Sequence, residues 1–120
     1  MPSDPPGEVH VEFTPEFKRK LRALAKKYRH IRSDVQPVID ALVAGEVLGD
    51  QVPRTPYAVF KVRILNRDIR KGKSSGYRLI YHRKTSTEVV LVTIYSKLDQ
   101  SDISAVTIRR IISAFEEGLS

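Results

Sequence analysis

Apolar residues recur at two different periods along the chain, and the change of period separates a helical part from a strand part. Val9, Val11 and Phe13 alternate with polar residues, which predicts a short, half-buried strand. Thr14 followed by Pro15 is typical of a helix N-cap with proline at the first helical position. Apolar residues then recur every three or four positions as far as about residue 29, which predicts an amphipathic helix.

A second helix is predicted to follow directly. Ser33 or Asp34 offers its cap, Pro37 lies within its first turn, and Gly45 is placed to end it. The two helices should form a helical hairpin. The proline-bearing stretch 49–56 cannot continue a helix and predicts a loop.

Beyond that loop the pattern is typical of strands. Residues 57–65, 77–83 and 89–95 are rich in β-branched and aromatic types and predict an antiparallel meander. The third run is apolar on both faces and should be central. Ser101 or Asp102 offers the cap of a last helix, with an apolar stripe from Ile103 to Phe115. The predicted order is β-α-α-β-β-β-α, an α+β fold with two N-terminal helices packed on one face of a small antiparallel sheet and a C-terminal helix.

Length and composition favour one domain without cofactor. The 120 residues suffice for a single core, so we expect a leader over 1–7 and one domain over 8–120. No apolar run approaches the length needed to cross a bilayer and the N-terminus lacks the features of a signal peptide, which predicts a cytoplasmic protein with no membrane association. The chain lacks cysteine and has only three widely spaced histidines, so we expect no metal site.

The net charge of +7 is concentrated in two blocks. Residues 18–32 hold eight basic residues and no acid, and a solvated helix face is the favoured interpretation there. Residues 61–84 hold nine basic residues against the single acid Asp68, well beyond a mixed-sign surface. This second block predicts a site for a polyanion, most simply RNA.

Strand alternation refines that site. Lys61 and Arg63 should lie on the solvent face of their strand, and antiparallel pairing places Arg78 near them. The long connection 66–76 adds four more cations with small residues that allow close approach to a phosphate, namely Arg67, Arg70, Lys71 and Lys73. Tyr95 and Lys97 should lie at the sheet edge, where a tyrosine can stack on a base and a lysine can bind a phosphate.

These residue types suit attack of an RNA 2′-hydroxyl on the adjacent phosphate, because fixed cations stabilise the charge that develops on the non-bridging oxygens. A clear acid and base pair is missing: only His82 and Asp68 are nearby. We interpret His82 as an exposed imidazole rather than a base, and Tyr77 and Tyr81 as core aromatics. Tyr95 remains open between packing and function.

Three segments together resemble the RelE/ParE superfamily of bacterial toxins, specifically the RelE/HigB-like messenger-RNA interferases: Phe60-Lys61-Val62-Arg63-Ile64, then Gly72 to Tyr81 with its Ser-Gly-Tyr-Arg-Leu-Ile-Tyr run, then Ile94-Tyr95-Ser96-Lys97. The resemblance covers roughly residues 9–115. It implies the toxin of a type II toxin-antitoxin system, a metal-independent endoribonuclease that cleaves mRNA, often on the ribosome, and that is silenced by a cognate antitoxin protein.

The resemblance also implies residue roles. Lys61 and Arg63 match the family's strand cations, Arg78 its phosphate-binding arginine, Lys97 a basic residue after the last strand, and Tyr95 replaces the catalytic tyrosine, although family members place theirs nearer the last helix. The RNA-binding residues implied alongside them are Arg67, Arg70, Lys71, Lys73, His82 and Arg83.

Two other functions fit the same element order. A ParE-like member would inhibit DNA gyrase by protein binding, but the cations on one strand face favour a nuclease. A non-catalytic double-stranded RNA-binding module would begin its last helix with lysines, where this chain has Ser101-Asp102-Ile103-Ser104.

Overall fold

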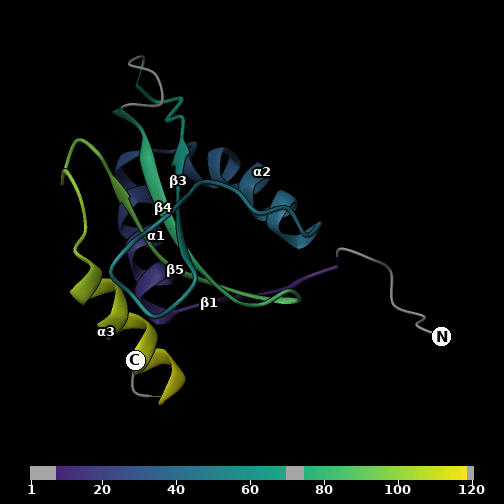
Figure 1. Ribbon diagram of the computed structural model, residues 1–120. Helices are drawn as coiled ribbons and strands as arrows, with labels where there is room; N and C mark the ends of the chain where they lie inside the picture. Colours follow the sequence, from purple (N-terminus) through teal and green to yellow (C-terminus); the bar gives the residue numbers. More distant parts are fainter. Residues whose placement is uncertain (1–7, 70–74, 119–120) are drawn as a thin grey trace.

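The computed structural model describes residues 8–69 and 75–118, which form three helices and a five-stranded sheet (Figure 1). The predicted leader 1–7 lies outside the described residues. In chain order the elements are β1 (His10–Phe13), α1 (Pro15–Lys27), α2 (Ile31–Val43), β2 (Asp50–Gln51), β3 (Val59–Ile64), β4 (Tyr77–Thr85), β5 (Glu88–Ser96) and α3 (Ala105–Glu116). The predicted α+β fold is confirmed, with the two-residue β2 added from the predicted loop.

The sheet has the order β1-β5-β4-β3-β2. Strands β3, β4 and β5 pair antiparallel as the predicted meander, and β1 pairs parallel with the first half of β5. The prediction that β5 is interior is therefore confirmed. The β4–β5 register shifts between Ile80 and Tyr81, where Val92 is the extra residue of β5. Because Val92 has no partner in β4, the side-chain alternation of β5 shifts by one residue at this bulge.

Helix α1 begins where the sequence predicts. The Thr14 hydroxyl accepts a hydrogen bond from the Phe17 backbone N–H at 2.9 Å and donates one to the Val92 carbonyl at 2.7 Å. Thr14 thus caps the helix and fixes it to β5 at the same time. The helix ends at Lys27, two residues before the expected position.

Helix α2 begins earlier than predicted, and the expected cap is wrong. It starts at Ile31 with His30 as N-cap, so Ser33 and Asp34 lie inside the first turn and Pro37 lies in the interior. The predicted end is confirmed. Gly45 has a φ of +94°, and its N–H and that of the next residue donate to the Leu42 and Ala41 carbonyls, which is a Schellman motif.

The larger core lies between the two N-terminal helices and one sheet face. Phe17, Leu24, Val35 and Leu42 of the helices pack against strand residues that are equally buried, including Val62, Ile64, Tyr77, Leu79, Tyr81, Leu91 and Ile94. Tyr77 and Tyr81 are each 0% exposed, so their prediction as core aromatics is confirmed. The Tyr81 hydroxyl donates to the Leu48 carbonyl at 2.6 Å, which satisfies its polar atom inside the core.

The sequence analysis expected the opposite sheet face to be open to solvent, but α3 covers part of it. Ile108 and Ile112 of α3 pack there on Val59, Ile80 and Val92 in a second, smaller core, and Figure 1 shows α2 and α3 on opposite sides of the sheet. The predicted cap of α3 is also wrong. Ser104 caps the helix by accepting from the Thr107 N–H at 3.1 Å, which leaves Ser101 and Asp102 in the connection before it. None of the described helices is long and apolar enough to cross a membrane.

Candidate functional site

The cations predicted on the strands form rows across the half of the sheet face that α3 leaves uncovered. In the strand registers Arg63 of β3 lies opposite Arg78 of β4, and Arg78 lies opposite Tyr95 of β5. Lys61 occupies the neighbouring row, opposite Ile80. The registers confirm that Lys61, Arg63 and Arg78 share one face, as alternation predicted.

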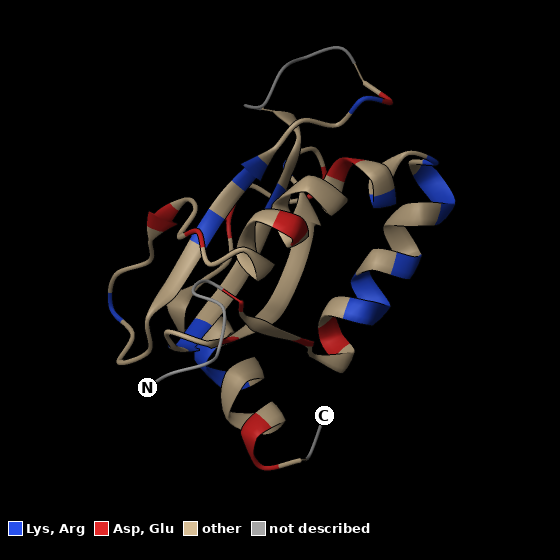
Figure 2. Cartoon of the chain, turned by 90° about the vertical axis from the view of Figure 1, so that its right-hand side faces the viewer, with Lys and Arg blue, Asp and Glu red and all other residues tan. Residues whose placement is uncertain are grey.

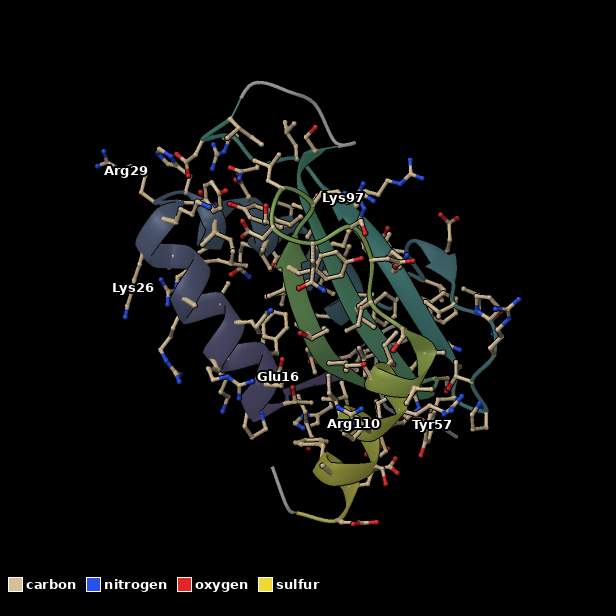
Figure 3. All side chains as sticks on the ribbon, turned by 90° about the vertical axis from the view of Figure 1, so that its left-hand side faces the viewer. Glu16, Lys26, Arg29, Tyr57, Lys97 and Arg110 are labelled. Carbon is tan, nitrogen blue, oxygen red and sulfur yellow. The ribbon has the colours of Figure 1, made fainter. Side chains whose placement is uncertain are left out.

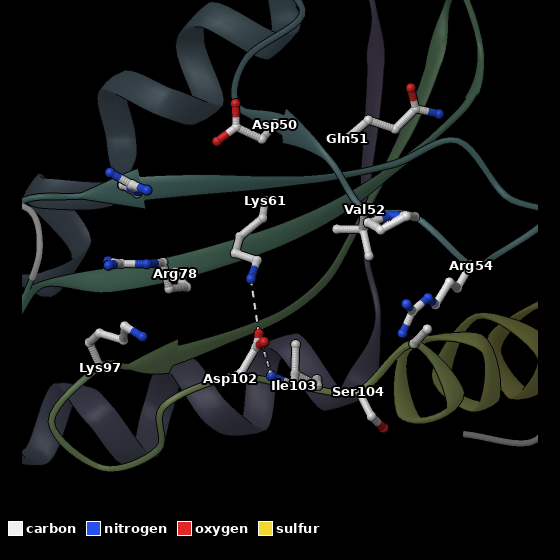
Figure 4. Close-up of a pocket in the computed structure, with 13 residues that line it drawn as sticks. Asp50, Gln51, Val52, Arg54, Lys61, Arg78, Lys97, Asp102, Ile103 and Ser104 are labelled. Carbon is white, nitrogen blue, oxygen red and sulfur yellow. Dashed lines mark hydrogen bonds and ion pairs between the residues drawn. The ribbon is translucent and has the colours of Figure 1, made fainter.

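These cations line an open groove of about 680 Å³ (Figure 4). Its floor is the strand face with Lys61, Arg63 and Arg78, and Lys97 lies at one end. One wall is the segment 50–54, and the other is the connection 102–105 that leads into α3. Five cationic side chains line the groove against only the two carboxylates of Asp50 and Asp102. An excess of positive charge in a concave site attracts and concentrates anions.

Asp102 places a carboxylate directly on the basic floor. Its Oδ1 accepts a hydrogen bond from Lys61 Nζ at 2.9 Å and from the Ile103 backbone N–H at 2.8 Å, and the Tyr95 hydroxyl lies 3.5 Å from the same oxygen. The hydrogen bond from the Lys61 ammonium, followed by that from the Ile103 N–H, lowers the pKa of Asp102. The side chain is therefore an anion at neutral pH, placed where a phosphate oxygen would contact Lys61.

The connection over the groove is held by further polar contacts. Lys97 Nζ donates to the Ser101 carbonyl at 2.6 Å, and Gln100 Nε2 donates to the Asp102 carbonyl at 3.0 Å. On the opposite wall Arg109 of α3 donates to the carbonyl of Arg54, whose φ of +67° is in the left-handed region. Both walls are thus held by hydrogen bonds to the elements beside the groove.

Arg78 is the most enclosed of the cations. It is 5% exposed, and its Nη1 donates to the Tyr77 carbonyl at 3.1 Å. A buried guanidinium directed along the floor is pre-organised, because little side-chain freedom is lost when it binds a ligand. Arg63, in contrast, is exposed and forms no ion pair within residues 8–69 and 75–118.

Tyr95 is packed in the interior, with its hydroxyl beside Asp102. The residue is 2% exposed, so its ring is not available to stack on a base. Burial, followed by the Asp102 charge, raises the pKa of Tyr95 to about 12. The phenol is therefore protonated at neutral pH, with its hydroxyl 3.5 Å from Asp102 Oδ1.

The structure does not bring Arg67 and Asp68 to the groove. Arg67 Nε donates to Asp34 Oδ1 of α2 at 2.6 Å, and Asp68 lies 2.7 Å from the His30 ring nitrogen. Both residues therefore tie the loop after β3 to the start of α2. The carboxylate beside the strand cations is therefore Asp102, and not Asp68 as the sequence analysis expected. The predicted RNA-binding residues Arg70, Lys71 and Lys73 lie outside the described residues.

His82 and Arg83 also lie away from the groove. His82 is 6% exposed and packs edge-on against Tyr57 with ring centroids 5.0 Å apart, so its interpretation as an exposed imidazole is wrong. Burial lowers the pKa of His82. Arg83 is two residues after Tyr81 in β4, so it lies on the same sheet face as Tyr81. The N-terminal helices cover that face, and Lys61 lies on the other one.

Gly76, directly before β4, serves the fold. A Cβ on Gly76 would lie 2.0 Å from the Ile64 carbonyl oxygen, so the absence of a side chain allows β3 and β4 to approach. The sequence analysis had assigned the small residues of this connection to close approach of a phosphate instead. The Gly76 carbonyl accepts from the Lys97 N–H at 2.9 Å, which positions Lys97 at the end of the groove.

The sequence analysis missed Asp50, Arg54, Asp102 and Ser104 as residues of the groove. Asp102 was considered only as a helix cap, because the fold-back of the connection over Lys61 is a long-range contact without a local signal. No cluster of three or more metal-ligating side chains occurs in the described part of the chain. The sequence matches no model of a known protein family and no curated protein, so the groove itself is the basis for assigning a function.

Proposed function

We propose that this protein is a toxin of the RelE/HigB-like type, a metal-independent endoribonuclease that cleaves mRNA in the cytoplasm, in association with the ribosome, and is silenced by a cognate antitoxin. The observation that carries the proposal is the groove in which Arg63 and Arg78, adjacent across two strands, lie beside Lys61 and Lys97. The RelE-like resemblance of the sequence supports the same activity.

The groove supports binding of a single RNA strand through its phosphates. Guanidinium groups bind two phosphate oxygens at once, and lysines add point charges beside them. Arg78 and Arg63 would hold the non-bridging oxygens of the scissile phosphate, with Lys97 on a neighbouring phosphate. This arrangement stabilises the negative charge that builds up as the 2′-oxygen attacks.

The reaction needs one proton acceptor and one donor. In the proposed step the 2′-oxygen forms a bond to phosphorus, the bond from phosphorus to the 5′-oxygen breaks, and a 2′,3′-cyclic phosphate remains. Asp102, the groove carboxylate that is paired with Lys61, would receive the 2′-hydroxyl proton. The ammonium of Lys61, 2.9 Å from it, would return a proton to the departing 5′-oxygen. The Tyr95 hydroxyl would position Asp102.

The test is cleavage of a single-stranded RNA by the purified protein, with and without ribosomes. Arg63 is exposed, so Arg63→Gln should preserve the fold while reducing the cleavage rate by about a hundredfold. Lys84→Gln removes one exposed charge outside the groove and is the control. In cells, expression should halt translation and growth, and Arg63→Gln should relieve both.

Other results would contradict the proposal. Growth arrest with intact mRNA and trapped gyrase–DNA complexes would assign the protein to the gyrase inhibitors. RNA binding at the groove without release of a 2′,3′-cyclic phosphate end would make it a non-catalytic RNA-binding module.

A further inference from the structure

Helix α1 carries a second basic surface, separate from the groove. The segment 15–32 holds eight cations and one acid, Glu16, and that acid is paired with Arg19. Figure 2 shows the basic positions following the helix along its length. In Figure 3 Lys26 and Arg29 project away from the rest of the molecule. Neither residue lines the groove.

Three of these cations form one row. Lys18, Arg22 and Lys26 are four residues apart, which places them on one side of the helix with a separation of about 6 Å along its axis. All three are exposed, and none forms an ion pair with the described residues. The row therefore presents its full charge to solvent.

Folding does not explain this row. Helix α1 is held by its buried Phe17 and Leu24 and by the Thr14 cap. The helix dipole favours cations such as Lys26 in the last turn, but it disfavours Lys18 near the positive N-terminal end. Cations four residues apart also repel one another. A row that costs stability at its start is explained by an anionic partner.

The chemistry of the row selects the partner. Protein interfaces use aromatic and apolar anchors and are depleted in lysine, and none of the large exposed hydrophobic side chains among the described residues lies on α1. Insertion into a lipid surface needs an apolar helix face, but that face is buried in the core. A nucleic-acid double helix, in contrast, is bound through its phosphates by charge and shape alone.

We propose that the Lys18–Arg22–Lys26 row binds the phosphate backbone of double-helical RNA and so docks the protein beside the strand that enters the groove. The choice of RNA over DNA rests on the proposed function. Helix α1 itself borders the connection beside the groove: Lys27, on the side of the helix away from the row, contacts Asp99 after β5 at 3.3 Å. Lys20 of α1 also lies with Asp102 and Tyr95 around a hollow of about 240 Å³ next to the groove.

The experiment uses the full chain and a labelled RNA hairpin of about 16 base pairs, with methylated 2′-hydroxyls so that it cannot be cut. The variant is Arg22→Gln with Lys26→Gln. The control is Lys84→Gln with Arg110→Gln, which removes the same two charge types from exposed positions outside α1 and the groove. Fluorescence anisotropy is recorded over a range of salt concentrations.

The α1 variant should bind the hairpin at least about tenfold more weakly than the control at 0.1 M salt, with the logarithmic salt slope reduced by about 1.8 for two lost phosphate contacts. Binding of a methylated single strand should be unchanged. Equal hairpin affinity of variant and control would overturn the inference, as would a loss seen only with a DNA duplex or with phosphatidylserine vesicles. Cleavage of a short single strand is measured separately: its absence contradicts the proposed nuclease and leaves the hairpin result standing.

Discussion

If the groove binds RNA as proposed, the charge of Asp102 competes with phosphate for Lys61, so Asp102→Asn should tighten RNA binding while slowing cleavage. The Lys61–Asp102 pair is 2.9 Å long, with side chains 33% and 66% exposed. An ion pair this exposed contributes at most about 1 kcal/mol, which limits both the loss of stability and the gain in affinity. Release of Lys61 should therefore strengthen binding of a single strand by up to about fivefold. One added phosphate contact should steepen the salt slope by about 0.7.

The assay is anisotropy of a labelled, methylated single strand at several salt concentrations, followed by cleavage of the unmodified strand. Asparagine keeps the shape of Asp102 and the oxygen that accepts from the Ile103 N–H, so the connection should hold its course. Asp99→Asn is the matched control, because it removes the same charge from the same connection where the partner is Lys27. Affinity that is unchanged or weaker than in the control would refute the competition. Faster cleavage would refute the assignment of Asp102 as proton acceptor.

Three further predictions concern stability and titration. Gly76→Ala should destabilise the protein by about 2 to 4 kcal/mol in urea unfolding, because its Cβ would lie 2.0 Å from a β3 carbonyl oxygen; Gly118→Ala, with open space around it, should cost only about 1 kcal/mol for its φ of +73°. The pKa of Tyr95 is near 10 in the unfolded chain and about 12 in the folded protein, so its contribution to the free energy of unfolding is present below pH 10 and is lost as the pH rises through 12. Tyr95→Phe should therefore lose less stability between pH 10 and pH 12 than the parent protein. An equal loss would contradict the burial of the phenol. Burial lowers the pKa of His82 in the folded protein, so its NMR titration midpoint should lie below pH 6.5. Its contribution to stability is present above pH 6.5 and should decline as the pH falls through the folded pKa. A midpoint above pH 6.5 would show that the ring is accessible to solvent.

Helix ends that are set by residues next to them in the sequence were predicted correctly. Thr14 and Pro15 gave the start of α1, and Gly45 gave the end of α2, because caps act through backbone groups a few residues away. The caps of α2 and α3 were wrong for a long-range reason. Asp34 binds Arg67, and Asp102 binds Lys61, so the carboxylate that could cap each helix is used elsewhere in the fold.

The candidate site was predicted in part. Period-two alternation placed Lys61 and Arg63 on one strand face, and the register confirmed Arg78 beside them. The prediction for His82 had no local basis that could decide it. By alternation His82 shares the face of Arg78 and Ile80, which the sequence analysis expected to be open. It is covered, because α3 and the Tyr57 ring pack on that half of the face.

The sequence by itself determined the α+β element order, the pairing of three strands as a meander and the concentration of positive charge on β3 and β4, because hydrophobic period and charge are properties of neighbouring residues. Only the tertiary structure decided that this face is divided into a covered apolar half and an open basic groove. It also decided that Asp102 lies on the groove floor. Lys61 and Asp102 are 41 residues apart, and their contact depends on how α3 packs on the sheet. That packing arises from burial of apolar surface between distant elements, which no local pattern of residues specifies.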